Sequence, residues 1–320
     1  MSYLDMLISA LGQGTVYAPM ALGVFIAFRI LNTPDLTIDG SFVFGMTVCA
    51  LVTVAGHPIL ALFAGALAGM LAGLVTGLLQ TKLRINPILS GILTMTGLYT
   101  VNYMVLGGQA NLYLQSMVPN KNGDPVPMAS RTVYKMFAVT GNGDVSALLF
   151  SALILGLCVA LLAVFFKTRL GIAIRATGDN EEMVRSSSIN ADLTRSIGIM
   201  LANGLVALSG AMLCQEQRYA DLGNGSGMLV VGLASVIIGQ ALFGRRGVSA
   251  GLVSAVVGSE IYRIILQAAY QIDMPSYTVK LLSALIVTVA LVLPLIKEKS
   301  LAWSRRRSGE RVRSEERGGR

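Results

Sequence analysis

The residues of this sequence that are best placed to do chemistry are polar side chains inside long apolar runs. Glu260 lies within the apolar run 248–270, and an acidic side chain at the centre of a membrane costs about 2.5 to 3.5 kcal/mol to insert. Arg263 follows three residues later on the same helical face, so Glu260 is either half of a structural ion pair or a substrate contact. Asp39 and Ser41 lie beside a polar break in another run, where irregular backbone and polar groups together favour the lining of a cavity.

Further polar residues within apolar runs complete the candidates for a translocation pathway: Thr94, Thr96, Asn102 and Asn203. Polar groups inside a membrane either line the path of a solute or form hydrogen bonds between helices. The sequence leaves both interpretations open for each candidate.

The side chains that usually bind metals or carry covalent catalysis are scattered. Cys49, Cys158 and Cys214 each lie within an apolar run, and their spacing matches neither a metal site nor a redox pair. The single histidine, His57, lies beside Pro58 in a short break, where we expect a solvated loop side chain. We therefore predict no catalytic residues, no metal and no cofactor, and a membrane-embedded enzyme is the least favoured class of function.

The elements that position these residues follow from the composition. Apolar residues make up 54% of the chain and charged residues 13%, whereas soluble domains have about 25% charged residues. The apolar runs are close to the roughly 20 residues that a membrane-spanning helix needs. We predict an all-α, polytopic transmembrane helical bundle with about eight or nine spans and a short cytoplasmic helix. The expected spans are residues 14–31, 40–56, 59–79, 87–106, 147–166, 196–214, 228–243, 248–270 and 277–296.

A polar interruption near the N-terminus leaves two span counts open. Asn32, Pro34, Asp35 and Asp39 separate the first two apolar runs. They either join two full spans or belong to a broken or re-entrant element, because non-helical backbone at membrane depth has to be buried in protein or line a cavity. The side of the membrane on which the N-terminus lies stays open as well.

The third expected span has small residues at every fourth position: Gly65, Gly69, Gly73 and Gly77. One face of this helix therefore has almost no side chains, which allows a neighbouring helix to approach closely. We expect tight packing within the bundle at this face.

The distribution of Lys and Arg predicts the orientation of the chain. Basic residues follow the third, fifth, seventh and ninth expected spans, and cytoplasmic connections carry such an excess. These residues are Lys82, Arg84, Lys167, Arg169, Arg175, Arg185, Arg195, Arg245 and Arg246, followed by those of the tail. The connection 107–146, with Lys121, Arg131 and Lys135, is then a long outer loop. The C-terminus is predicted to be cytoplasmic.

Most of the net charge of +8 belongs to the last part of the chain. Residues 297–320 include nine basic and four acidic residues, a net charge of +5. We expect a disordered cytoplasmic tail near anionic lipid headgroups and no nucleic-acid partner. The tail follows a single transmembrane domain over residues 1–296. The first basic residue is Arg29, so no cleavable signal peptide is expected.

The predicted cytoplasmic connection 167–195 is too polar to span the membrane, but it has clear signals for the start of a helix. Asp179 or Asn180 is a suitable N-cap, and Glu181 and Glu182 favour the positive N-terminal end. We predict a short amphipathic helix of about two and a half turns, which is too short to be stable without a docking partner.

The same helix has an expected end and an expected contact surface. Asn190 is suited to the left-handed conformation that closes a helix. Met183, Val184 and Ile189 provide a small apolar surface between the caps.

This loop resembles a known family of membrane proteins, the permease subunits of ATP-binding-cassette (ABC) importers of the branched-chain amino acid and ribose permease family. The residues that carry the resemblance are Gly171, Arg175, Ala176, Gly178 and Asn180, with Ala21-Leu22-Gly23, Asp35-Leu36-Thr37-Ile38-Asp39-Gly40-Ser41, Asn86-Pro87 and Thr94-Met95-Thr96-Gly97. The resemblance covers roughly residues 10 to 296 and is nearest in wording to a bacterial subgroup for aromatic or other amino acids. The loop departs from the family pattern at 186–188, where serines replace alanines, and at Asn190, where glycine is common.

The resemblance implies a function and a set of partners. In this family the loop forms a coupling helix that fits a groove on a separate ATPase subunit, which assigns that role to Gly178, Asp179, Asn180, Glu181, Glu182, Met183, Val184 and Arg185. The chain lacks the G-x-x-x-x-G-K-[ST] phosphate loop, so ATP hydrolysis is expected on another subunit. Further expected partners are an extracytoplasmic substrate-binding protein, a second permease copy or related permease, and the lipids of a bacterial inner membrane. The substrate is expected to be a small polar solute, an amino acid above all. The alternative is an ion-coupled secondary transporter that uses intramembrane carboxylates.

Overall fold

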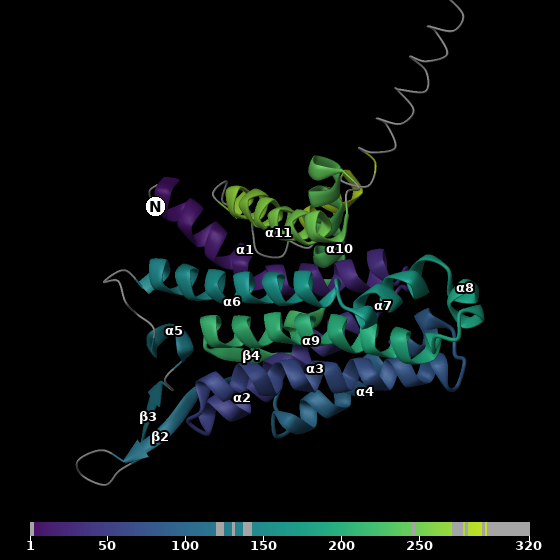
Figure 1. The fold of residues 1–320 in the computed structure, drawn as a ribbon. Coiled ribbons are helices and arrows are strands. Elements are labelled where there is room, and N and C mark those ends of the chain that lie inside the picture. The colour runs from purple at the N-terminus through teal and green to yellow at the C-terminus, as the bar shows by residue number, and fades with distance from the viewer. Residues whose placement is uncertain are drawn as a thin grey trace, which may run out of the picture.

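The computed structural model describes residues 3–119, 125–129, 132–136, 143–244, 247–270, 278, 281–289 and 292 (Figure 1). Its helices are α1 (Tyr3–Phe25), the π-helix η1 (Ile26–Ile30), α2 (Ile38–Val54), α3 (Pro58–Thr81), α4 (Pro87–Val105), α5 (Val133–Met136), α6 (Gly143–Phe165), α7 (Arg169–Asp179), α8 (Glu181–Ser186), α9 (Ala191–Gln217), the 3-10 helix η2 (Leu222–Gly225), α10 (Met228–Phe243) and α11 (Val248–Tyr270). Short strands lie in the connections: β1 (Asn111–Tyr113), β2 (Gln115–Pro119), β3 (Pro125–Ala129) and β4 (Tyr219–Asp221).

The predicted transmembrane bundle is confirmed. Among the described residues, 7 helices are long and apolar enough to cross a membrane, and α2 is a shorter apolar helix. Each of the first eight expected spans coincides with one of these helices. The ninth expected span, 277–296, lies outside the described residues except for residue 278, a helical stretch at 281–289, and residue 292, and the tail 297–320 lies wholly outside them.

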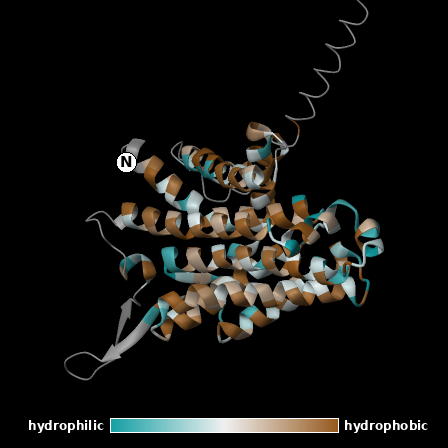
Figure 2. Ribbon diagram, viewed as in Figure 1, coloured by the Kyte–Doolittle hydropathy of each residue, from teal (hydrophilic) through white to brown (hydrophobic). Residues whose placement is uncertain are grey.

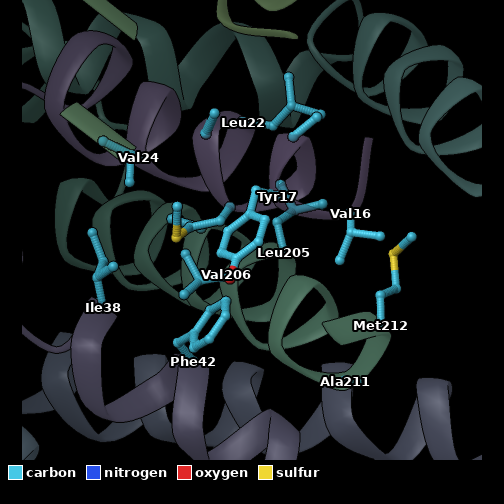
Figure 3. Packing of buried hydrophobic residues seen from close by; sticks show 14 of the residues in the cluster. Val16, Tyr17, Leu22, Val24, Ile38, Phe42, Leu205, Val206, Ala211 and Met212 are labelled. Carbon is cyan, nitrogen blue, oxygen red and sulfur yellow. The ribbon is translucent and has the colours of Figure 1, made fainter. Parts of the chain in front are cut away.

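Helix α9 is the centre of the bundle and packs against α1, α2 and α3. Figure 3 shows side chains of α1, α2 and α9 meeting in the apolar core around Tyr17 and Phe42. The rings of Tyr17 and Phe42 are nearly parallel, with centroids 6.1 Å apart. By contrast, most of α6 is exposed on the outside of the bundle, as expected for a helix that faces lipid tails.

The glycines of the third expected span lie against α9, which confirms the predicted tight packing. A Cβ atom added at Gly73 would lie 2.7 Å from the carbonyl oxygen of Ile199 and 2.9 Å from the Cβ of Asn203. Gly65, Gly69 and Gly77 meet α9 in the same way. Backbone contact at this distance is possible only because glycine has no side chain.

The polar interruption near the N-terminus is a true break between helices. Helix α1 continues as the π-helix η1, which ends at Ile30, and α2 begins only at Ile38. Thr33, Asp35 and Thr37, which lie in the break, are buried inside the protein. The break is buried in protein, as irregular backbone at membrane depth requires. Helix α1 with η1 is long enough to cross a membrane, whereas α2, at 17 residues, is about 26 Å long, slightly short of the membrane core.

The two polar connections of the chain lie at opposite ends of the bundle. Figure 1 shows α7 and α8 at one end and the β2–β3 hairpin with α5 at the other. Figure 2 shows hydrophobic residues along the helices between these ends and hydrophilic residues gathered around α7 and α8. The strands were not foreseen from the sequence: β1 pairs with β4, and β2 with β3, both antiparallel.

Candidate translocation pathway and coupling segment

A cavity of about 620 Å³ lies between α2, α4 and the connection from β4 to α10. It brings together three of the residues predicted to line a pathway, Asp39, Thr96 and Asn102. We call it the α2–α4 cavity. Its other lining residues are Gly40, Val43, Met95, Tyr99, Tyr103, Ala110, Asp221, Leu222, Gly223, Gly225 and Ser226.

Asp39, at the wall of this cavity, links the first turn of α2 to the first turn of α10. It lies in the first turn of α2, and its carboxylate accepts hydrogen bonds from the backbone N–H groups of Gly227 (3.1 Å) and Leu229 (2.7 Å), at the start of α10. The first N–H groups of a helix have no partner within it, so Asp39 caps α10 from another element. Irregular backbone inside a membrane bundle is tolerated where it lines a cavity, as it does here.

Helix α4 supplies the polar and aromatic side of the cavity. Thr96, Tyr99 and Tyr103 are exposed and follow one another at helical spacing on one face. Thr96 donates to the carbonyl oxygen of Ile92 at 2.8 Å. Asn102 is buried and meets α2 through long hydrogen bonds of 3.4 Å, with Thr47 and with the carbonyl oxygen of Gly40.

The charge of the α2–α4 cavity is negative. Asp39 and Asp221 line it, and no Lys, Arg or His is among the described residues that line it. A cavity with this charge attracts a positively charged group and repels an anion.

Ser41 and Asn203 do not line the cavity but belong to a buried hydrogen-bond network. The hydroxyl of Ser41 donates to Oδ1 of Asn203 at 2.7 Å, and Nδ2 of Asn203 donates to Asp35 at 2.6 Å and to the carbonyl oxygen of Ile199 at 3.0 Å. Asp35 also accepts from the backbone N–H of Thr37 at 2.9 Å. Both polar atoms of the Asn203 amide are thus paired within the protein. The network attaches the non-helical segment before α2 to helix α9.

Asp35 is the polar residue that sequence reasoning left out of the candidate set. Its side chain is fully buried, although the sequence places it only in a break between apolar runs. The pattern Asp35-x-Thr37, typical of a turn in which the Asp side chain binds the backbone two residues on, was the available signal.

The remaining predicted pathway residues lie elsewhere. Thr94 faces an apolar pocket between α3 and α4 and donates to the carbonyl oxygen of Ser90 at 3.0 Å. Glu260 packs against Gly14 of α1, and its Oε2 atom has no hydrogen-bond partner among the described residues. The ion pair with Arg263 is not formed, because the Arg263 guanidinium lies over the ring of Tyr17, 3.3 Å from its centroid.

The connection 167–195 forms two helices where one was predicted. Helix α7 ends at Asp179, and α8, with 6 residues, is shorter than the expected two and a half turns. Asn180 is the N-cap of α8, since its side chain accepts from the backbone N–H of Met183 at 3.0 Å. We call α7 and α8 together the coupling segment.

The expectation for Asn190 is wrong. Asn190 has a φ of −76° and is the N-cap of α9, accepting from the N–H of Leu193. Ser188 instead takes the left-handed conformation, with a φ of 59°. The side-chain oxygen of Asn suits both roles, and the immediate start of α9 after residue 190 selects the cap.

Charged side chains hold α8 against the start of α9. Glu181 pairs with Arg185 at 2.7 Å and with Arg195 at 2.8 Å, and Arg185 also pairs with Asp192. The hydrogen bonds to Glu181 and Asp192 raise the pKa of Arg185 above its usual value. Glu181 and Arg185 are therefore used within the protein, so they are less available to a partner than Glu182.

The apolar residues in and after α8 divide into a buried one and exposed ones. Val184 is buried, with 1% of its surface exposed, whereas Met183 is 52% and Ile189 40% exposed. Leu193 at the start of α9 adds a further exposed apolar side chain at 55%. The exposed apolar surface at this end of the bundle therefore includes Met183 of α8 and Ile189 in the connection to α9, but not Val184.

The coupling segment also contacts the helix break. Gly178 of α7 packs against the backbone of Ile30 and Leu31, and its carbonyl oxygen accepts a hydrogen bond from Asn32 at 3.0 Å. Thr177 and Thr194 share a buried hydrogen bond of 2.7 Å that ties α7 to α9. A displacement of α7 would thus act directly on the end of η1 and on α9.

Comparisons with known proteins agree with this architecture. Residues 6–291 match the family described as "Branched-chain amino acid transport system / permease component". The chain is 35% identical to the tyrosine transport system permease protein of Clostridioides difficile (strain R20291), over 88% of each chain. It is 24% identical to the ribose import permease protein of Escherichia coli (strain K12), over 90% of this chain and 84% of that one.

A third relative is the nucleoside ABC transporter permease protein of Lactococcus lactis subsp. cremoris (strain MG1363), which is 26% identical over 64% of this chain and 62% of its own. No solved structure matches the chain. The match to the family covers nearly the whole transmembrane bundle, and the relatives include permeases of ABC importers. The chain belongs to the permease family of the branched-chain amino acid transport systems.

Proposed function

We propose that this chain forms the translocation pathway of an ATP-driven importer for an amino acid, with ATP hydrolysis on a separate subunit. The observation that carries the proposal is the contact between the coupling segment and the helix break. Gly178 packs on Ile30 and Leu31 at one end of the break, and Asp39 lines the α2–α4 cavity beyond its other end. A force applied to α8 therefore has a short physical route to the cavity.

The α2–α4 cavity is the proposed part of the pathway. It is large enough for a small solute at about 620 Å³, since ligand pockets usually fall between about 300 and 1,000 Å³. The exposed polar face of α4, with Thr96, Tyr99 and Tyr103, is costly against lipid tails. A second permease copy, or a related permease, is proposed to cover this face, so that the solute passes between the two subunits.

The chemistry of the cavity supports an amino acid as the substrate. Asp39 and Asp221 give the cavity a negative charge, which suits the ammonium group of an amino acid whose carboxylate points away from both aspartates. Tyr99 and Tyr103 offer aromatic surface beside them, which suits an aromatic side chain. The tyrosine permease relative points in the same direction.

The proposed coupling surface consists of Glu182 and Met183 on α8 and of Ile189 in the connection from α8 to α9, all of which are exposed. Gly178, Asp179 and Asn180 set the bend between α7 and α8, and Glu181 and Arg185 brace α8 on α9. ATP binding to the partner would favour one state of the permease through different contacts at this surface in its two states.

The proposed surroundings follow from the orientation of the bundle. The coupling segment and the tail 297–320 face the cytoplasm of a bacterial cell, and the permease lies in its inner membrane. The hairpin at the opposite end of the bundle is the proposed contact for an extracytoplasmic substrate-binding protein.

The test is a charge placed on the coupling surface. We expect Met183→Asp to reduce both the co-purification of a phosphate-loop ATPase and the uptake of substrate at least tenfold, because an apolar contact then has to bury a charge, which costs several kcal/mol. The melting temperature should not change, because Met183 is 52% exposed.

Met136→Asp is the matched control, since Met136 is 53% exposed at the opposite end of the bundle. It should leave the ATPase bound. Val184→Asp is not a test of docking, because Val184 is buried and the variant should lose stability. If the ATPase co-purifies with Met183→Asp as well as with the wild type, and uptake is unchanged, α8 does not couple the ATPase to the permease.

An ion-coupled secondary transporter, the alternative from the sequence, is disfavoured by the family to which the chain belongs. The carboxylates that it would need are Asp39, which caps α10, and Glu260. Uptake that persists in Asp39→Asn and Glu260→Gln would remove ion coupling at these groups. Uptake that is lost in both variants but needs no ATPase would favour the alternative.

A further inference from the structure

A second cavity lies at the end of the bundle where the coupling segment is found, about 250 Å³ in volume. Three separate parts of the chain form it: the end of α1 with η1, helix α7, and the turn between α10 and α11. We call it the α7 cavity. Its lining residues are Phe25, Arg29, Ile30, Asn32, Arg175, Asp179, Gln240, Gly244, Gly247, Val248 and Gly251.

The α7 cavity contains hydrogen-bond donors that the protein leaves unused. Arg29 and Arg175 make no ion pair or hydrogen bond with any residue that the structure describes, and neither does the side chain of Gln240. The ion pairs of the described chain join α8 to itself and to α9. Two guanidinium groups and an amide without partners among the described residues therefore line one half-open cavity, in which Arg29 and Arg175 are exposed.

The charge around this cavity is positive. Asp179 is the single acidic residue among its described lining residues, and it does not pair with Arg175 although it lies four residues after it in α7. Two arginines and one aspartate leave a net charge of +1 on the described lining residues, which a bound anion would balance.

We propose that the α7 cavity binds a phosphate group, as carried by the headgroup of an anionic phospholipid. Arginine binds phosphate through parallel N–H···O bonds, and basic pockets between helices at the membrane surface bind anionic headgroups. The cavity lies at the end of the helices that line it, where a headgroup would be, and not along their length. A free phosphate ion has the same chemistry and is the other possible source.

The position of the site gives it a consequence for the transporter. A bound phosphate would contact η1 through Arg29 and α7 through Arg175. It would thus clamp the coupling segment to the end of the broken helix, beside the contact of Gly178 with Ile30. This consequence rests on the proposed function, whereas binding itself does not.

The test is the thermal stability of the purified full-length chain in a neutral detergent, titrated with a short-chain phosphatidylglycerol, a short-chain phosphatidylcholine or inorganic phosphate. A ligand that binds only the folded state raises the melting temperature. We expect phosphatidylglycerol to raise it more than phosphatidylcholine. We expect the apparent Kd for phosphatidylglycerol to rise at least tenfold in Arg29→Gln and in Arg175→Gln. A response to inorganic phosphate of equal size, lost in the same variants, would support the phosphate site and identify free phosphate as the source.

Arg169→Gln is the matched control, since Arg169 begins the same helix and is exposed, but does not line the cavity. It removes the same charge and should keep the wild-type Kd. A chain that ends at residue 296 excludes binding to the basic tail and should also respond. Equal Kd values in Arg29→Gln, Arg175→Gln and Arg169→Gln would overturn the proposal. So would a melting temperature that responds to neither phosphatidylglycerol nor inorganic phosphate.

Discussion

At the scale of single residues, the polar groups inside the bundle divide into those that fix the fold and those that face open space. Asn203 has its amide fully paired with Ser41, Asp35 and Ile199. Thr96 bonds only to its own helix and lines the α2–α4 cavity. The type of residue does not separate the two groups, because Ser, Thr and Asn occur in both. Asp39 and Asn102 have both roles, since they line the cavity and also bond to another element. A polar residue fixes the fold where a partner on another element lies within hydrogen-bond distance.

The pair of Asp35 and Asn203 has a measurable interaction energy. Asn203→Ala should lower the free energy of unfolding by about 2 to 4 kcal/mol, because a buried carboxylate loses its amide donor. Thermal unfolding in detergent of Asn203→Ala, Asp35→Ala and the double variant gives the double-mutant cycle. The double variant should lose at least about 1 kcal/mol less than the sum of the single variants. Strict additivity would contradict the pairing.

Asp39 should act on stability through helix α10. Asp39→Ala leaves the N–H groups of Gly227 and Leu229 without an acceptor, which should cost about 1 to 2 kcal/mol in the free energy of unfolding. Asp39→Asn should lose less, because an amide oxygen still accepts a hydrogen bond. The melting temperatures of the two variants, compared with that of the wild type, measure the effect. If Asp39→Ala unfolds at the wild-type temperature, the cap contributes nothing.

At the scale of elements, small residues decide where the helices can meet. The glycine face of α3 lets the α9 backbone approach at Gly73, and this contact holds the centre of the bundle. The coupling segment shows the same effect at Gly178, which packs on the backbone of Ile30 and Leu31. Neither contact leaves room for a larger residue.

Gly73→Ala should therefore destabilise the protein although alanine favours helices. The added Cβ would lie 2.7 Å from the Ile199 carbonyl oxygen, and such overpacking typically costs about 1 to 3 kcal/mol. Gly156→Ala on α6 is the control, because nothing lies within 4 Å of its added Cβ. It should be neutral or stabilising by up to about 1 kcal/mol. Equal melting temperatures for the two variants would mean that α3 and α9 can move apart without cost.

At the scale of the whole molecule, the two ends of the bundle differ in what they present. One end has the coupling segment and the basic α7 cavity, and the other has the β2–β3 hairpin and α5. The proposed importer needs these ends on opposite sides of the membrane, because an ATPase and an extracytoplasmic binding protein cannot share a side.

Labelling of single cysteines measures this orientation. In a background without Cys49, Cys158 and Cys214, Met136→Cys and Met183→Cys place thiols of nearly equal exposure, 53% and 52% for the native methionines, at the two ends. We expect a membrane-impermeant maleimide to label Met136→Cys in intact cells, and Met183→Cys only after permeabilisation. The reverse pattern would invert the predicted topology.

The sequence by itself determined the first eight apolar helices and the family, but neither the division of the connection 167–195 into two helices nor the strands. The spans could be predicted because the cost of inserting polar groups into a membrane acts on each segment separately. The cap at Asn180 and the glycine face of α3 could also be predicted, because both are local patterns. The cap depends on residues within about one helical turn, and the glycine face on residues within one helix. The family could be recognised because its motifs are local as well.

The tertiary structure alone decided which polar residues meet. Asp35 and Asn203 are 168 residues apart in the chain, so no local pattern joins them. Arg263 is one helical turn from Glu260, yet it lies over Tyr17 of another helix, and Val184 is buried while its neighbour Met183 is exposed. Each of these outcomes depends on which helix packs beside the residue, and packing is a property of the assembled bundle that a single segment does not contain.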